Sequence, residues 1–350
     1  MDSATLHEPR WRPVAQDVFS PAATACGDHR IALFLRDAHG ELLCRFREDR
    51  EWRTLRTLGI PGAPIGGARS LLPADWPIAA CATGRDQIHL LARSPEGELL
   101  HGALHGDDWG GFECVGAPAA LVGGIPVPMG LASAPTACSR APGRMDVFAV
   151  GAAGALLHST WEGQGFGEFE SLGGVPAGGG SDATAPIAGP ISAFSCGPKA
   201  MGVVARGSGG DLLLKWWNGA SWTAFVSLGA PQERDSVYPA VLRAVPLSGS
   251  PAAAGGGSTR LDVVARGPGG DLLHKWWDGK IWSPFQSLGL PHPGSPPAPA
   301  PFSAASLACV WGRYRLDVFA RAADGKLYNA FWDGSWDHPR PASRSNDARD

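Results

Sequence analysis

The chain has 350 residues, of which 30 are basic and 33 acidic, and its formal net charge is -3. The basic residues are spread along the chain, so the sequence shows no footprint of a nucleic-acid-binding protein. No apolar run reaches the roughly 18 residues of a membrane span, and residues 1–13 lack the apolar core of a signal peptide. We therefore expect a soluble protein that is cytoplasmic, or exported without a cleavable signal peptide.

Glycine and proline are abundant, with 48 and 31 residues, yet 44% of the chain is hydrophobic and 14 residues are Trp. This composition supports a packed core with many turns rather than disorder. Seven cysteines in a long chain without a signal peptide argue against a disulfide framework. Five of them lie 14 or 16 residues before a repeated glycine and predict one small buried position: Cys26, Cys81, Cys138, Cys196 and Cys309. We expect no bound metal and no cofactor.

A repeated unit of about 57 residues organises the chain, and its anchors are six glycines spaced 55 to 60 residues apart: Gly40, Gly97, Gly154, Gly210, Gly270 and Gly325. The unit from Leu261, LDVVARGPGGDLLHKWWDGKIWSPFQSLGLP, aligns without gaps with the unit from Met201, MGVVARGSGGDLLLKWWNGASWTAFVSLGAP. Short β-branched or aromatic runs alternate with turn residues, which is typical of antiparallel strands. In chain order we expect a first strand with the cysteine, a second at VVAR, a third at LLHKWW and a fourth ending at SLG.

The repeats extend over about 21–64, 77–120, 133–177, 190–231, 240–291 and 302–339. Four-stranded units of this length predict an all-β propeller, with six blades favoured over seven. We expect one domain over 1–340 and a disordered tail over 341–350. Because Trp11-Arg12-Pro13 resembles Trp282-Ser283-Pro284, the amino terminus is a candidate for the outer strand of the last blade, for which Trp336 competes.

Two further positions of the aligned repeats carry polar residues, and we call such an equivalent position a column. Five units have an arginine four residues before the anchor glycine: Arg36, Arg93, Arg206, Arg266 and Arg321. Asp262 and Asp317 lie on the same strand face as this arginine, so we predict structural ion pairs of Asp262 with Arg266 and of Asp317 with Arg321. Histidines share one column at His101, His158 and His274. Three such imidazoles could bind a metal ion if they faced the central axis, but that strand is expected to be third from the axis, which disfavours their convergence.

The turn after the third strand brings an aromatic ring next to a polar side chain, which is the combination that sugar recognition requires. We predict ligand-binding residues there and at the aromatic column that follows: Trp161, Glu162, Trp217, Asn218, Trp222, Trp277, Asp278, Trp282, Trp332 and Asp333. The alternative is structural, because the tryptophans can pack between blades and the acidic residue before glycine favours the turn.

The pattern DVFARxxDGxLxxxxWDGxxW with its terminal SLG, found at Leu316–Trp336, Leu261–Gly289 and Met201–Gly229, resembles the fucose-binding bacterial propeller lectins of the PLL type. The resemblance implies glycan pockets between adjacent blades, with fucosylated glycans as the leading partners. That family is usually seven-bladed and has shorter repeats, so the blade number and the linker length depart from its pattern.

Three functions remain open. The leading hypothesis is a multivalent carbohydrate-binding propeller that uses blades 3 to 6. The second is a scaffold for a protein partner, favoured by the long proline-rich loops and by Arg47 and Leu104, which replace the turn tryptophan in blades 1 and 2. The third is an enzyme with one asymmetric site at the axial mouth. Since the sequence contains no HExxH, GxSxG or P-loop motif, binding is favoured over catalysis.

Overall fold

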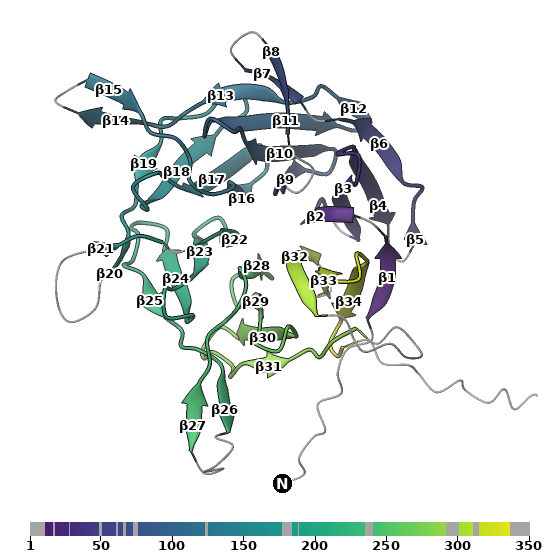
Figure 1. The fold of residues 1–350 in the computed structure, drawn as a ribbon, viewed down its shortest axis with the longest axis vertical. Coiled ribbons are helices and arrows are strands. Elements are labelled where there is room, and N and C mark those ends of the chain that lie inside the picture. The colour runs from purple at the N-terminus through teal and green to yellow at the C-terminus, as the bar shows by residue number, and fades with distance from the viewer. Residues whose placement is uncertain are drawn as a thin grey trace, which may run out of the picture.

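The computed structural model describes residues 11–336 except 17, 28, 49–50, 61, 66–67, 73–75, 123–124, 177–183, 188, 235–240, 292–300 and 311–314. The tail expected at 341–350 lies outside the described residues. The regular elements of the described part are β-strands, and six small sheets surround a central axis (Figure 1). The predicted six-bladed, all-β propeller is confirmed.

The first three blades follow one another along the chain. Blade 1 comprises β2 (Val18–Ala25), β3 (Arg30–Asp37), β4 (Leu42–Glu48), β5 (Glu51–Trp52) and β6 (Arg56–Gly59). Blade 2 comprises β9 (Ala79–Gly84), β10 (Gln87–Arg93), β11 (Leu99–His105), β12 (Asp108–Trp109) and β13 (Glu113–Gly116). Blade 3 comprises β16 (Thr136–Ala141), β17 (Arg144–Val150), β18 (Leu156–Trp161) and β19 (Glu170–Ser171). In blades 1 and 2 two short strands share the outer position.

The remaining blades repeat the pattern of blade 3. Blade 4 comprises β22 (Ile191–Gly197), β23 (Ala200–Arg206), β24 (Leu212–Trp217) and β25 (Val226–Ser227). Blade 5 comprises β28 (Ala252–Gly255), β29 (Leu261–Arg266), β30 (Leu272–Trp277) and β31 (Gln286–Ser287). Blade 6 comprises β32 (Phe302–Val310), β33 (Arg315–Ala322), β34 (Leu327–Trp332) and β1 (Arg12–Ala15). The first strand of each repeat is innermost, and these innermost strands contact one another around the ring.

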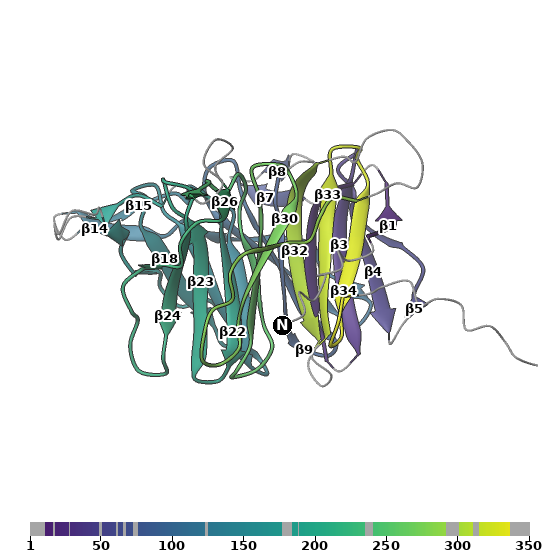
Figure 2. The same cartoon turned by 90° about the horizontal axis from the view of Figure 1, so that it is seen from below.

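Four two-stranded hairpins connect successive blades from blade 1 to blade 5: β7 (Gly62–Ile65) with β8 (Ala68–Leu71), β14 (Ala119–Val122) with β15 (Ile125–Pro128), β20 (Val175–Pro176) with β21 (Thr184–Ala185), and β26 (Gln232–Arg234) with β27 (Leu242–Ala244). Several of them extend beyond the rim in Figure 1 and lie toward the upper side in Figure 2. We call this side the hairpin face. The opposite side is the turn face, because the first-to-second and third-to-fourth strand turns meet there, as Gly279 does with Thr259.

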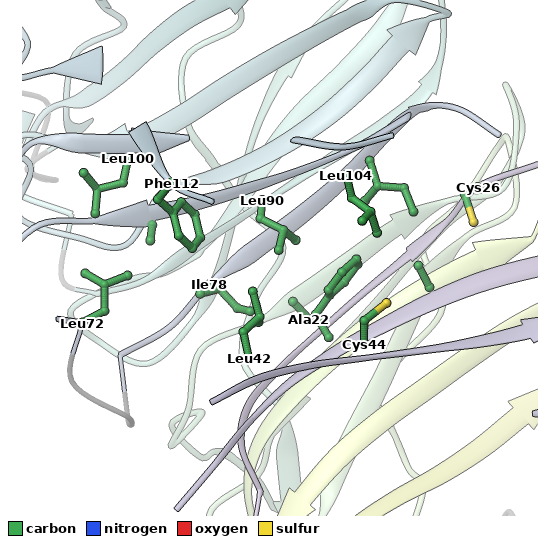
Figure 3. Packing of buried hydrophobic residues seen from close by; sticks show 14 residues of the cluster. Ala22, Cys26, Leu42, Cys44, Leu72, Ile78, Leu90, Leu100, Leu104 and Phe112 are labelled. Atoms are coloured by element: carbon green, nitrogen blue, oxygen red, sulfur yellow. The ribbon is translucent and has the colours of Figure 1, made fainter. Parts of the chain in front are cut away.

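The core lies between blades rather than within them. Figure 3 shows the cluster between blades 1 and 2, where Leu42 and Cys44 face Leu90 and Phe112. The leucine two residues after each anchor glycine is buried in all six blades. Four of the repeated cysteines are buried free thiols, and burial raises the pKa of Cys26 to about 11 and that of Cys81 to about 12. The predicted small buried position is therefore confirmed for Cys26, Cys81, Cys138 and Cys196, whereas the side chain of Cys309 lies outside the described residues.

The repeated arginine is structural, but its partners are backbone carbonyls of the next blade. Arg266 donates to the carbonyl of Phe302 at 3.2 Å, and the amide of Phe302 donates to the carbonyl of Gly270 at 2.8 Å. In blade 4, Arg206 likewise donates to the carbonyl of Leu247, and the amide of Leu247 donates to the carbonyl of Gly210. The predicted ion pairs of Asp262 with Arg266 and of Asp317 with Arg321 are wrong, because Arg321 instead donates to the carbonyl of Val18 and both carboxylates bind other groups. The arginine column thus ties five of the blades to their successors, and blade 3, which has Val150 in this column, is the exception.

The anchor glycines make this contact feasible. Gly270 has φ +81°, and a Cβ atom there would lie 2.4 Å from Cβ of Pro301. Gly210 has the same positive φ and would meet Pro246. A residue with a side chain would be strained at both positions and would separate the blades.

The amino terminus closes the ring. β1 pairs antiparallel with β34, with Arg12 opposite Asn329, and the indole Nε1 of buried Trp11 donates to the carbonyl of Leu288 at 3.0 Å. The predicted outer strand is confirmed, but its alignment changes. In blade 5 the residue opposite the equivalent His274 is Gln286, so Trp11 corresponds to Phe285. Trp336, which bridges Trp332, corresponds to Trp282, and both candidates therefore contribute to the outer part of blade 6.

Candidate functional site: the seams between blades

A seam is here the packing interface between two consecutive blades, and we name it by their numbers. On the earlier blade, the second and third strands present two polar residues twelve positions apart. These pairs are Asp146 with His158, Asp262 with His274, and Asp317 with Asn329. On the later blade, the end of the third strand presents the turn tryptophan or its replacement. Paired antiparallel strands bring such side chains onto one face.

Seam 3/4 contains a network of four charged or titratable groups, in which Asp146 and His158 are buried and Glu170 is exposed. Arg140 donates to both carboxylate oxygens of Asp146 at 2.7 and 3.0 Å. His158 lies between two carboxylates, with Nε2 at 3.0 Å from Asp146 and Nδ1 at 2.7 Å from Glu170. Burial alone would raise the pKa of Asp146, but the hydrogen bonds from His158 and Arg140 outweigh it and lower that pKa. The carboxylate is therefore ionised at neutral pH.

Blade 4 contributes the aromatic side of seam 3/4. The guanidinium of Arg140 lies over the ring of Trp217, 4.5 Å from its centroid, and Trp222 meets His158 edge-on with ring centroids 5.7 Å apart. Both tryptophans are half-buried. This seam thus places partly exposed indole surface beside carboxylate, imidazole and guanidinium groups.

Seam 5/6 repeats the arrangement. Arg260 donates to both oxygens of Asp262 at 2.8 and 2.6 Å, and His274 Nε2 lies 2.9 Å from the same carboxylate. Blade 6 supplies Trp332, whose ring centroid lies 5.2 Å from Arg260, and Trp336, which lies edge-on to His274 at 5.5 Å. Arg260 also lies 5.3 Å from Trp276 of its own blade. Seams 3/4 and 5/6 therefore share an Arg–Asp–His cluster that faces half-buried indoles.

Seam 6/1 has the same aspartate but no tryptophan at the turn position, although Trp52 of blade 1 lies edge-on to Phe319 of blade 6 with ring centroids 5.9 Å apart. Arg315 donates to Asp317 at 2.8 and 3.2 Å, and Arg47 of blade 1 binds the same carboxylate at 2.7 and 2.8 Å. Arg47 occupies the column of Trp217 and Trp332. Asp317 is fully buried, so two guanidiniums saturate the carboxylate and leave it no room for a ligand.

The other three seams lack the aspartate. In seam 2/3 its place is taken by His89, which lies 3.0 Å from Thr83 and 2.8 Å from His101. Burial lowers the pKa of His89 to about 4, with His101 and His105 adding to the effect, so this imidazole is neutral at pH 7. In seams 4/5 and 1/2 the position is Gly202 and Ala32, and the surroundings are apolar.

The tryptophans predicted to bind ligand lie in three different environments. Trp217, Trp222 and Trp332 lie beside Arg–Asp–His clusters. Trp277 and Trp282 lie together in seam 4/5 with ring centroids 5.8 Å apart, but they pack against an apolar cluster. Trp161 is buried against His89, with ring centroids 4.3 Å apart.

The polar residues after these tryptophans form turn contacts. Asp278 accepts hydrogen bonds from the amides of Lys280 and Ile281, both at 2.8 Å. Asn218 accepts the equivalent bonds from Ala220 and Ser221 at 3.0 Å. Glu162 pairs with Arg144 at 2.8 Å, and the amide of Asp333 donates to the carbonyl of Ser335. These contacts match the structural alternative, and a sugar-binding role for the four residues stays a prediction.

Sequence reasoning did not select the residues that form the clusters. Asp262 and the histidines were noticed only as part of the repeat, and Asp146, Arg140 and Arg260 were not singled out. An Arg-Leu-Asp sequence at 260–262 and 315–317, just as the second strand begins, is the signal that was available. In blade 3 the equivalent Arg144 binds Glu162 and Arg140 takes its role, so the motif alone would have named the wrong arginine there.

The axis holds a cavity of about 930 Å³, bounded by the innermost strands. Its described lining includes Thr24, Cys81 and Ser192 but no Asp, Glu or His. The described residues contain no group of three or more metal-ligating side chains. No helix in the described part is long and apolar enough to cross a membrane.

No family model and no curated protein matches the chain. Solved structures do. AofleA from Arthrobotrys oligospora is 14% identical, with a TM-score of 0.62 over 96% of this chain and 90% of that one. A mutant of the Aleuria aurantia lectin AAL in complex with Fucalpha1-6GlcNAc is 16% identical, with a TM-score of 0.59 and coverages of 92% and 96%. The SapL1 lectin in complex with alpha methyl fucoside is 14% identical, with a TM-score of 0.58 and coverages of 94% and 99%. At these identities the likeness establishes the fold, a six-bladed β-propeller as the Aleuria lectin is described to have.

Proposed function

We propose that this protein is a carbohydrate-binding propeller that engages glycans, with fucosylated glycans as the leading candidates, at several seams. The observation that supports it best is the Arg–Asp–His cluster beside half-buried tryptophans at seams 3/4 and 5/6. Several structures that share the fold are of fucose-binding lectins. The finer assignment to the PLL type also stays part of this proposal.

The chemistry of these seams fits a sugar ring. An indole face packs against the apolar C–H face of a pyranose, and carboxylate, imidazole and guanidinium groups pair with its hydroxyls. Because Arg140 and Arg260 are held by aspartates, their guanidiniums are already oriented and lose little entropy on binding. Two or more such sites on one rigid ring would raise the avidity for a multivalent glycan.

The candidate seams are not equivalent. Seams 3/4 and 5/6 combine tryptophan with polar groups, seam 4/5 offers Trp277 and Trp282 without them, and seam 6/1 is filled by Arg47. We therefore assign the proposed sugar binding of blades 3 to 6 chiefly to Trp217 and Trp332.

A protein-interaction role is the second candidate, and one observation favours it. The β26–β27 hairpin exposes Val241 and Leu242, with 47% and 57% of their surface accessible. Exposed apolar side chains at the edge of a projecting two-stranded sheet are suited to contact a partner protein. This surface belongs to a hairpin outside the ring, so the two roles do not compete.

The test is a tryptophan fluorescence titration with a panel of monosaccharides that includes methyl α-L-fucoside. We expect saturable changes that Trp217→Ala and Trp332→Ala each weaken and that Trp277→Ala alters less. Thermal unfolding of each variant controls for folding. A well-folded parent protein that gives no saturable signal with any sugar, checked by glycan array, would contradict the proposal and favour the protein-interaction role.

A further inference from the structure

Of the three histidines that share one position of the repeat, only His274 lacks a glutamate partner at Nδ1. In blade 2, His101 Nδ1 lies 3.2 Å from Glu113, and in blade 3, His158 Nδ1 lies 2.7 Å from Glu170. Each of these glutamates is opposite its histidine on the outer strand. In blade 5 the residue opposite His274 is Gln286. Nδ1 of His274 is buried and has no hydrogen-bond partner among the described residues.

The chemical character of the missing partner follows from the other ring nitrogen. His274 Nε2 lies 2.9 Å from Oδ1 of Asp262, and an ionised carboxylate only accepts hydrogen bonds. Arg260 and His274 together hold the pKa of Asp262 below its ordinary value, although burial alone would raise it. In the neutral form of the imidazole the proton therefore lies on Nε2 and Nδ1 carries a lone pair, so that this nitrogen lacks a donor such as a hydroxyl group.

Aromatic rings enclose the position. The ring of His274 stacks on Trp276 with centroids 5.0 Å apart, and Trp336 meets it edge-on at 5.5 Å. Arg260 lies between Trp276 and Trp332. A ligand that offers a hydroxyl to Nδ1 would thus meet apolar ring surfaces on several sides, which suits a neutral sugar better than an anion or a peptide amide.

We propose that His274 determines specificity at seam 5/6, where its Nδ1 accepts a hydrogen bond from one hydroxyl of a bound neutral sugar. In seam 3/4 the carboxylate of Glu170 occupies the equivalent nitrogen, so a sugar must displace it and binds more weakly. Seam 5/6 is then the principal site of the ring. This inference rests on the proposed carbohydrate-binding function. It adds that seam 5/6 binds sugar more tightly than seam 3/4 and that Nδ1 of His274 is the acceptor atom.

Access to Nδ1 depends on the outer-strand residue opposite His274. Gln286 lies on the outer strand β31, is half-buried and stands opposite His274 in the strand register. Its side chain can change rotamer without disturbing the ladder, because the ladder uses backbone groups. A sugar can thus enter from the rim of the blade.

A reciprocal pair of near-isosteric variants tests the inference. Gln286→Glu places a carboxylate opposite His274, as Glu170 is opposite His158, and Glu170→Gln removes that carboxylate from seam 3/4. With methyl α-L-fucoside, or with the best ligand of the sugar panel, calorimetry on the full chain should show at least a tenfold loss of affinity at the tighter site for Gln286→Glu. Glu170→Gln should leave that site unchanged and strengthen the weaker one. Monodeoxy analogues of the same sugar should show that one hydroxyl accounts for most of the effect.

Three outcomes would overturn the inference. Unchanged affinity in folded Gln286→Glu would remove His274 from the site, and this result leaves the proposed function intact. Sugar density that lies away from Nδ1 in a crystal of the complex would do the same. Absence of binding by the parent chain would instead overturn the proposed function and this inference together. Melting temperatures of both variants exclude a folding defect as the cause.

Discussion

Seams 5/6 and 6/1 flank the same blade and begin from the same Arg-Leu-Asp sequence, yet they are completed differently. At seam 5/6 the next blade supplies Trp332, so Asp262 binds one guanidinium and one imidazole. At seam 6/1 the next blade supplies Arg47, and Asp317 binds two guanidiniums. At these two seams, the residue in the turn-tryptophan column therefore distinguishes a candidate binding site from a seam whose carboxylate is saturated. Seam 6/1 adjoins blade 6, which contains strands from both ends of the chain.

The largest difference is expected on neutralising the two aspartates. Asp317→Asn leaves Arg47 and Arg315 without their buried counter-ion, which should cost roughly 3–5 kcal/mol of unfolding free energy. Asp262→Asn should cost less, about 1–3 kcal/mol, because only Arg260 loses its ion pair and its side chain is 19% exposed. Chemical denaturation of both variants measures the difference. Equal losses would show that the second guanidinium contributes nothing to seam 6/1.

Trp11→Ala should weaken seam 5/6 from the other side. The substitution removes the hydrogen bond to Leu288 and the ring contact with Phe302, whose centroid lies 4.7 Å away. We expect a loss of roughly 3 kcal/mol, at the lower end for buried aromatic-to-alanine changes. Trp11→Phe, which matches Phe285 of blade 5, is the control and should recover most of the loss in thermal unfolding. A variant as stable as the parent would mean that β1 does not hold blade 6.

Seam 2/3 should respond to acid in a different pH range from the aspartate seams. The pKa of His89 is lowered from its ordinary 6.5 to about 4 in the folded protein, so between these values the unfolded chain binds more protons. Its contribution is complete above pH 6.5 and falls as pH decreases toward 4, by roughly 3 kcal/mol. Asp146, Asp262 and Asp317 have lowered pKa values, so their contribution is lost only below pH 3.8. Denaturation curves at pH 4 to 7 for the parent and His89→Asn measure the effect, and identical slopes would contradict it.

The smallest effect is expected at the turn. Asp278→Ala removes the two amide hydrogen bonds of an exposed turn and should lower the melting temperature slightly. Because its carboxylate serves the turn, sugar affinity should not change, in contrast to Trp332→Ala. A marked loss of affinity in this variant would restore Asp278 as a ligand.

The repeat predicted the blades because its spacing sets the strand number, and the six leucines and the four described cysteines of the repeat are buried as this spacing implies. The seam sites were not predicted, because the polar cluster of one blade meets tryptophans that the next blade supplies. Asp262 and Arg266 share one strand face, which made their pairing the natural expectation, but Arg260, two residues before Asp262, binds the carboxylate instead. Arg47 and Asp317 are 270 residues apart, and no local pattern connects them.

The amino-terminal alignment failed for a related reason. Trp11-Arg12-Pro13 matches Trp282-Ser283-Pro284 in residue type, whereas the strand register aligns Trp11 with Phe285. Matching tryptophan with tryptophan therefore gave the wrong alignment, because the backbone pairing of the strands determines which residues are equivalent. Seams 5/6 and 6/1 could be distinguished only from the structure, which places Trp332 and Arg47 at the same position of the repeat, each beside its aspartate.

The pairing of β1 with β34 has a consequence for how the molecule is made. Blade 6 needs residues 12–15 and residues 327–332, so it cannot be completed until almost the whole chain has left the ribosome. Blades 1 to 5 have all their strands earlier and can form in order of synthesis. Until then the nascent protein is an open arc in which Arg47 and Asp317 have not met, and joining its ends is the longest-range step of folding.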